Sequence, residues 1–231
     1  MLGMGGSQLY IPILYWLGMD FKNQAIPLGL LLNVCTSSSA AFTYLTKGLV
    51  KLRMAFPFAV TMLVFAPVGA LLNFRLPVKP IIFIFAMFTL TAAILVLSEW
   101  KPKTKIFTKK NEILLGVTTG IILGLLVGLI GRGGGSFIMP ILLLTGLDPK
   151  NAAATSSFIV TFSGGAGFLT HLFKADLSLW VTLATVCSVL LGSQLGSRLM
   201  ASKLKSPAIK KIFGIVLVLV AFLLLKDVFL R

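Results

Sequence analysis

Long apolar blocks alternate with short polar connectors along the whole chain. Seven blocks approach membrane-spanning length: residues 24–46, 54–74, 78–98, 112–131, 152–173, 177–197 and about 207–230. About 20 helical residues, at 1.5 Å each, cross the ~30 Å hydrocarbon layer of a bilayer. Two shorter apolar pieces, 7–19 and 136–147, each follow a glycine cluster and are too short to span alone. The pattern predicts seven or eight transmembrane helices and two glycine-broken half-helices.

Composition narrows the fold class to an all-α polytopic membrane protein. The chain is 57% hydrophobic and 12% charged, whereas about a quarter of a soluble domain is charged. The net charge of +15 would suggest a nucleic-acid partner in a soluble protein, but here the cations lie between apolar blocks. Lysines and arginines in such connectors indicate the orientation of a membrane protein. No nucleic-acid partner is therefore expected. The six carboxylates all lie at block edges or in connectors, so no block interior offers an acid for a proton relay.

The basic connectors predict which end of the bundle faces the cytoplasm. Residues 47–53 and 99–112 carry eight of the lysines and arginines, and we place both on the cytoplasmic side. The segment 197–211 is just as basic but lies an odd number of blocks away. A count of the blocks therefore places 197–211 on the opposite side of the membrane from the other two basic connectors, which conflicts with its positive charge.

The chain matches itself when it is shifted by 128 positions. The stretch "GMGGSQLYIPILYWLGMDFKNQA" (3–25) then lies on "GRGGGSFIMPILLLTGLDPKNAA" (131–153) without a gap, and eleven of the 23 positions are identical. The identities include glycine, proline, aspartate, lysine and asparagine, which an oily composition alone does not produce. Further along, "VGALLNFRL" (68–76) resembles "LGSQLGSRL" (191–199). We interpret the pattern as the duplication of a whole module.

The duplication predicts a first transmembrane module at 1–98, a basic cytoplasmic connector at 99–111 and a second module at 112–231. Only the second module has about 20 apolar residues, 112–131, before its break, so we expect the first to be truncated rather than naturally shorter. An odd number of crossings per module makes the repeats inverted, which we favour, and an even number makes them parallel. Duplicated modules with matching breaks are typical of secondary transporters.

The glycine breaks are the predicted substrate site. Unwound backbone is tolerated at membrane depth only where it is buried in protein or lines a wet cavity. A helix that starts at such a break points free N–H groups and its positive dipole end at the break, which favours an anion. Arginine would add a planar fork of donors, and nearby hydroxyls donate without adding charge. The predicted substrate-binding residues are Gly5, Gly6, Ser7, Gln8, Asn33, Arg132, Gly133, Gly134, Gly135, Ser136, Thr155 and Ser156.

Several of these residues have a structural alternative. For Arg132 it is an interfacial side chain that snorkels to the headgroups, and for Thr155 and Ser156 it is close helix packing. Asp148 is expected to cap the helix that follows, and His171, the sole histidine, to pack at the interface. No cofactor or metal is expected, and the chain lacks the clustered acids, histidines and cysteines of a membrane enzyme.

These motifs together resemble the sulfite exporter TauE/SafE family of membrane permeases. The resemblance rests on the glycine cluster, the proline-centred apolar stretch, "LLLTGLDPKNAAATSS" and the duplicated "G..LG.RL" ending. It implies a secondary transporter of sulfite, sulfoacetate-like molecules or other small sulfur oxyanions and organosulfonates across the cytoplasmic membrane. The first module departs from the pattern, because "IPLG" (26–29) stands where Thr155 and Ser156 have their counterparts. An anion channel and a non-transporting membrane subunit are the alternatives. The expected partners are a small anion and the lipid bilayer, with a homodimer left open.

Overall fold

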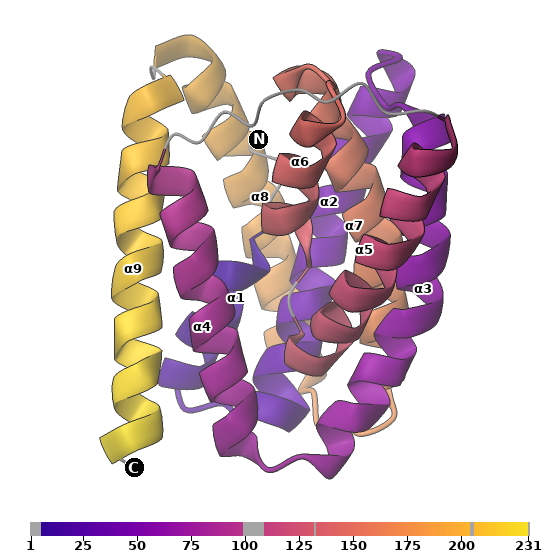
Figure 1. The fold of residues 1–231 in the computed structure, drawn as a ribbon. Coiled ribbons are helices and arrows are strands. Elements are labelled where there is room, and N and C mark those ends of the chain that lie inside the picture. The colour runs from indigo at the N-terminus through magenta and orange to yellow at the C-terminus, as the bar shows by residue number, and fades with distance from the viewer. Residues whose placement is uncertain (1–5, 99–108, 132, 204–205, 231) are drawn as a thin grey trace.

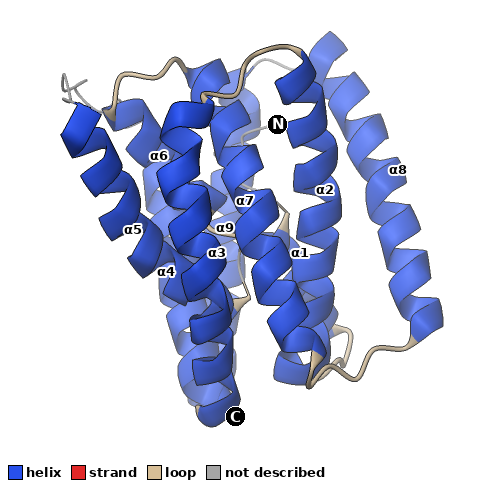
Figure 2. Ribbon diagram, turned by 90° about the vertical axis from the view of Figure 1, so that its right-hand side faces the viewer, coloured by secondary structure: helices blue, strands red, loops and turns tan. Residues whose placement is uncertain are grey.

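The computed structural model describes residues 6–98, 109–131, 133–203 and 206–230, and every regular element in these ranges is helical (Figure 1 and Figure 2). The helices pack side by side into one bundle, with α8 at an edge beside α2 (Figure 2). In chain order they are α1 (Ser7–Trp16), the π-helical turn η1 (Phe21–Ala25), α2 (Ile26–Thr46), α3 (Leu52–Arg75), α4 (Val78–Leu97), α5 (Lys109–Ile130), α6 (Gly135–Leu144), α7 (Pro149–Leu172), α8 (Leu179–Lys203) and α9 (Ser206–Leu230).

Each predicted apolar block contains one helix, and both predicted half-helices are ten-residue helices, α1 and α6. Within the described residues, five helices are long and apolar enough to cross a membrane: Phe21–Thr46, Leu52–Arg75, Val78–Leu95, Lys110–Ile130 and Pro149–Leu172. The all-helical class is thus confirmed, and the chain has the character of a multi-pass membrane protein. The count of seven or eight crossings stays a prediction, because the apolar stretch found in α8 is only Leu179–Gly192.

The two half-helices run in opposite directions from the middle of the bundle. In Figure 1, α1 descends from the middle to the lower end, whereas α6 rises from the middle to the upper end. Each half-helix is followed by a left-handed glycine, Gly18 with φ 93° and Gly146 with φ 86°, a conformation that ends helices and that glycine adopts without strain. The two turns lie 128 positions apart, so the same local sequence makes the same turn in both halves.

An aspartate precedes the next helix in each half, with different results. The side chain of Asp20 caps η1 by accepting hydrogen bonds from the backbone N–H groups of Lys22 and Asn23, at 3.1 and 2.6 Å. Asp148 occupies the corresponding N-cap position before α7 but makes no side-chain capping bond. The predicted cap at Asp148 is therefore wrong. The start of α7 at Pro149, the first helical position, is as expected.

Helix boundaries in the first half recur in the second. The first residues of α1, η1 and α4 lie 128 positions before those of α6, α7 and α9. Corresponding helices also run in opposite directions in Figure 1: α2 rises where α7 descends, α3 descends where α8 rises, and α4 rises where α9 descends.

The helices that flank the basic segments meet at one end of the bundle. Helices α2, α4 and α8 end, and α3, α5 and α9 begin, at the upper end in Figure 1. Helix α6 returns the chain to that end although it spans only half the depth of the bundle. A count of full-length blocks omits this return and therefore places the segment 197–211 at the wrong end. The conflict predicted for the basic segment 197–211 therefore disappears.

Helices α3 and α5 make the most extensive contact in the bundle. Four glycines spaced by four residues, Gly116, Gly120, Gly124 and Gly128, form one face of α5, and a β-carbon at each would crowd or overlap an atom of α3. This glycine seam brings the two helices together as small residues do in other membrane bundles. It holds the upstream side of the second break in place.

Candidate functional site

The second break is a short, left-handed interruption between two helices. Helix α5 ends at Ile130 and α6 begins at Gly135, and between them Gly131 and Gly134 have φ angles of 71° and 31°. These values are unfavourable for residues with a side chain, which explains why the sequence places glycine there. Arg132, the predicted anion clamp, lies outside the described residues.

The two breaks meet inside the bundle. The backbone N–H of Gly133 donates a buried hydrogen bond of 3.0 Å to Oγ of Ser7, the first residue of α1, although 126 residues separate them. Ser7 is completely buried. Gly6, the N-cap of α1, has an ordinary φ of −96°, so the described part of the first break lacks the left-handed glycines of the second. Gly5 lies outside the described residues.

Two buried amide side chains, on residues that neighbour this junction, have no hydrogen-bond partners. Gln8, in the first turn of α1, and Asn33, in α2, are 1% and 0% exposed. Neither the nitrogen nor the oxygen of either amide has a partner. The Asn33 amide lies against Gly133 so closely that a β-carbon there would overlap its nitrogen. The absence of a side chain at Gly133 therefore leaves the space in which Asn33 approaches the start of α6.

The predicted hydroxyl groups divide into two locations. Ser136 is buried in the first turn of α6, and Oγ of Ser156 donates to the carbonyl of Gly135 over 3.4 Å. Oγ1 of Thr155 instead accepts the backbone N–H of Lys51 at 3.0 Å, at the N-terminus of α3. Ser7, Asn33, Gly133, Gly135 and Ser156 thus join α1, α2, α6 and α7 at the breaks, with Gln8 and Ser136 in the first turns beside them, whereas Thr155 contacts the loop before α3.

Two further polar side chains hold the last carbonyls of α5. Nδ2 of Asn73, in α3, donates to the carbonyl of Leu129 over 2.5 Å, and Nε2 of His171, in α7, lies 2.8 Å from the carbonyl of Gly128. Both side chains are buried, and His171, in the last turn of α7, packs inside the bundle against the end of α5. Nothing in the sequence spacing points to these contacts, because their partners are 56 and 43 residues away.

We expect Asn73→Leu to lower the stability of the folded protein by about 1–3 kcal/mol, because it leaves the buried Leu129 carbonyl without its donor. Thermal unfolding of the purified protein in detergent would measure the loss. Thr91→Val is a suitable control, since the Thr91 side chain is exposed and bonds only within its own helix. Equal unfolding temperatures for the two variants would contradict the role given to Asn73.

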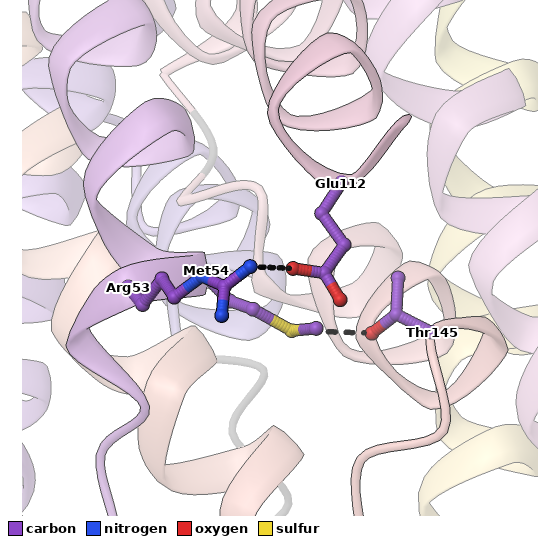
Figure 3. Close-up of polar contacts among 4 residues, drawn as sticks. All are labelled: Arg53, Met54, Glu112 and Thr145. Carbon is purple, nitrogen blue, oxygen red and sulfur yellow. Dashed lines mark hydrogen bonds and ion pairs between the residues drawn. The ribbon is translucent and has the colours of Figure 1, made fainter. Parts of the chain in front are cut away.

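The upper ends of α3, α5 and α6 are joined outside the breaks. Arg53 and Glu112 form an ion pair of 3.3 Å between α3 and α5, and Oγ1 of Thr145 lies 3.4 Å from Sδ of Met54 (Figure 3). A groove of about 480 Å³ beside this pair has a mostly apolar lining that includes none of the break residues. Because Arg53 already has an acidic partner, the groove is a poor candidate for the anion site.

The described part of the site is lined by neutral donors and acceptors. Asp20 and Asp148 lie in the turns that follow the half-helices, and Asp227 accepts from the indole N–H of Trp16 at 2.9 Å. Among the described residues, no group of three or more His, Cys, Asp or Glu could hold a metal ion. The arrangement is suited to binding by hydrogen bonds and helix dipoles rather than to acid–base chemistry.

Comparison with known proteins identifies the relatives of this architecture. A family model described as sulfite exporter TauE/SafE matches residues 1–224. The probable membrane transporter protein YunE of Bacillus subtilis is 33% identical over 115 residues, 49% of this chain and 42% of that protein. The sulfite exporter TauE/SafE family protein 1 of Arabidopsis thaliana is 38% identical over 72 residues, 31% of this chain and 16% of that protein.

A probable membrane transporter protein of Haemophilus influenzae is 31% identical over 130 residues, 52% of this chain and 49% of that protein. The matched segments thus span less than half the length of each of these three relatives. No solved structure matches.

Proposed function

We propose that this chain, which belongs to the sulfite exporter TauE/SafE family of membrane transporters, is a secondary transporter of small sulfur oxyanions or organosulfonates. The observation that carries the proposal is the buried hydrogen bond between Gly133 and Ser7, which joins the N-termini of two half-helices. Paired helix N-termini beside unpartnered amides favour an anion without requiring a buried cation. The substrate class comes from the family and the location from this geometry.

We propose that the two halves are inverted repeats that alternate around this junction. The recurrence of helix starts after 128 positions and the opposite directions of corresponding helices support an inverted duplication. Because α1 and α6 approach the junction from opposite ends, rocking one half against the other would open the site to one side at a time. No buried carboxylate is available in the described residues to couple this motion to protons, and movement down the substrate gradient is the simplest mechanism.

We propose that the protein lies in the cytoplasmic membrane with its upper end, as drawn in Figure 1, toward the cytoplasm. The lysine-rich connector 99–111 and the segments 47–53 and 197–211 all join helices that end there. Positive charge in short connectors is retained on the cytoplasmic side of membrane proteins. In this orientation α6 would start at the junction and run toward the cytoplasm.

The proposal predicts saturable sulfite flux into liposomes that contain the purified chain. Ser7→Ala should reduce the initial rate by about tenfold, because it removes both the acceptor for the Gly133 N–H group and a hydroxyl donor to the anion, and a loss of ~1.4 kcal/mol is a factor of ten. Ser98→Ala provides the matched control, since Ser98 is exposed at the end of α4 and bonds only within that helix.

Three results would count against the proposal. If Ser7→Ala transports as fast as Ser98→Ala, the junction of the half-helices is not the binding site. Flux that rises without saturation would instead identify a channel. If the unaltered chain carries neither sulfite nor organosulfonates at any concentration, the substrate assignment is wrong.

A further inference from the structure

The unpaired carbonyl oxygens of Gln8 and Asn33 are a feature of the site that the binding of an anion does not explain. Both side chains are at least 99% buried, and neither amide has a hydrogen-bond partner. Buried polar groups in folded proteins are nearly always paired, and each unpaired group costs about 1–3 kcal/mol. These two amides therefore offer four buried hydrogen-bonding atoms to a ligand.

The position of the amides specifies where that ligand binds. The Asn33 nitrogen occupies the space that a Gly133 side chain would fill, and also lies 3.6 Å from where a β-carbon of Gly164 would stand. Gln8 follows Ser7, whose hydroxyl oxygen accepts the Gly133 N–H. Because that bond uses the Ser7 oxygen as an acceptor, the Ser7 proton stays available for donation. Gln8 thus lies in the first turn of α1, and the Asn33 amide lies against the start of α6. The positive dipole ends of both helices favour negative charge there.

An amide side chain is both a hydrogen-bond donor and an acceptor. Its nitrogen can donate to an anionic oxygen of a ligand, but its carbonyl oxygen must accept a hydrogen bond from a donor. A fully deprotonated oxyanion offers acceptors only and would leave the oxygens of Gln8 and Asn33 unpaired. An oxyanion that also bears a hydroxyl group would satisfy both ends of an amide.

We propose that the site selects small monovalent sulfur oxyanions that carry an O–H group, which donates to a side-chain carbonyl oxygen of Gln8 or Asn33 while the S–O oxygens accept from the amide nitrogens. Bisulfite and hydroxyalkanesulfonates belong to this class, whereas the sulfite dianion and simple alkanesulfonates do not. The inference rests on the proposed transport function and adds the hydrogen-bonding character of the substrate. Sites that hydrogen-bond a substrate hydroxyl reject the analogue that lacks it more strongly than apolar pockets reject a changed shape.

Competition between two sulfonates of equal charge tests this selectivity. The full chain in liposomes would transport labelled sulfite at fixed pH in the presence of 2-hydroxyethanesulfonate or ethanesulfonate, which differ by one hydroxyl group. We expect the hydroxylated compound to inhibit at a concentration at least about tenfold lower, the factor that corresponds to one hydrogen bond of ~1.4 kcal/mol. Gln8→Met and Asn33→Leu, which keep the side-chain size but remove the amide, should together abolish the preference, and Ser98→Ala should retain it.

The outcomes separate this inference from the transport function. Equal inhibition by the two sulfonates in the unaltered protein overturns the selectivity while sulfite flux itself remains. A complete absence of saturable sulfite flux refutes the proposed function instead. If the amide variants do not fold, the pH profile decides: the sulfite rate at constant total concentration should fall as bisulfite is converted to the dianion, and a rate that rises with the dianion overturns the inference.

Discussion

Gly128→Ala is expected to destabilise the folded protein by about 2–3 kcal/mol, a large cost for one methyl group. A β-carbon at this position would overlap the backbone carbonyl of Ala66 and lie 2.7 Å from the backbone nitrogen of Ala70, both in α3. Backbone atoms of a helix cannot rotate aside as a side-chain end can. Helices α3 and α5 would have to separate, which would also disturb the contact between His171 and the Gly128 carbonyl.

Thermal unfolding in detergent would measure this effect, with Gly165→Ala as the matched control. Gly165 lies within α7, and a β-carbon there would meet nothing within 4 Å. The control should be unchanged or up to about 1 kcal/mol more stable, because alanine favours helix more than glycine does. Similar destabilisation by both substitutions would mean that the glycine seam does not control the packing of α3 on α5.

The sequence predicted the helices well because the bilayer imposes a simple rule on them. A helix that crosses lipid must be apolar along about 20 residues, so the blocks could be read directly from the chain. The self-match also located both half-helices, whose proline and glycine positions correspond. The conflict over topology arose because α6 crosses only half of the bundle and yet reverses the position of everything after it.

The sequence predicted the candidate site mainly through the repeated glycine breaks. The glycine clusters led to Ser7, Gln8 and Gly133, since these residues lie in the matching breaks. The same pattern did not reveal that Asn73 and His171 hold the end of α5, because such contacts depend on how distant helices pack. The repeat was also unreliable for detail: Asp20 caps its helix through its side chain, and its counterpart Asp148 does not.

Thr161 shows what a fuller use of the repeat could have found. It lies 128 positions after Asn33, and its hydroxyl is 3.2 Å from that of Ser37 between α2 and α7. The two equivalent helices therefore contact each other through this pair of hydroxyl groups. The side chains differ, because Asn33 brings an unpaired amide to the second break whereas Thr161 bonds to its neighbours. The two halves consequently make unequal contributions to the proposed site.

Gly133→Ala is expected to reduce sulfite flux by about tenfold or more and to destabilise the protein by about 1–3 kcal/mol. The new β-carbon would overlap the Asn33 nitrogen and lie 3.0 Å from Cγ1 of Val160. Asn33 is fully buried, so its amide would have to move within the bundle to relieve the overlap. Flux into liposomes and thermal unfolding in detergent would be measured on the same preparation.

The double variant Gly133→Ala/Asn33→Ala separates the steric contribution of Asn33 from its binding contribution. Removing the amide relieves the overlap, so the unfolding temperature should return toward that of Asn33→Ala alone. Flux should stay low in both proteins, because the amide that pairs with the anion is missing. If flux recovered fully with stability, Asn33 would be a packing residue, and the anion contact would have to be assigned to Ser7, Gln8 and the N-terminus of α6 without it.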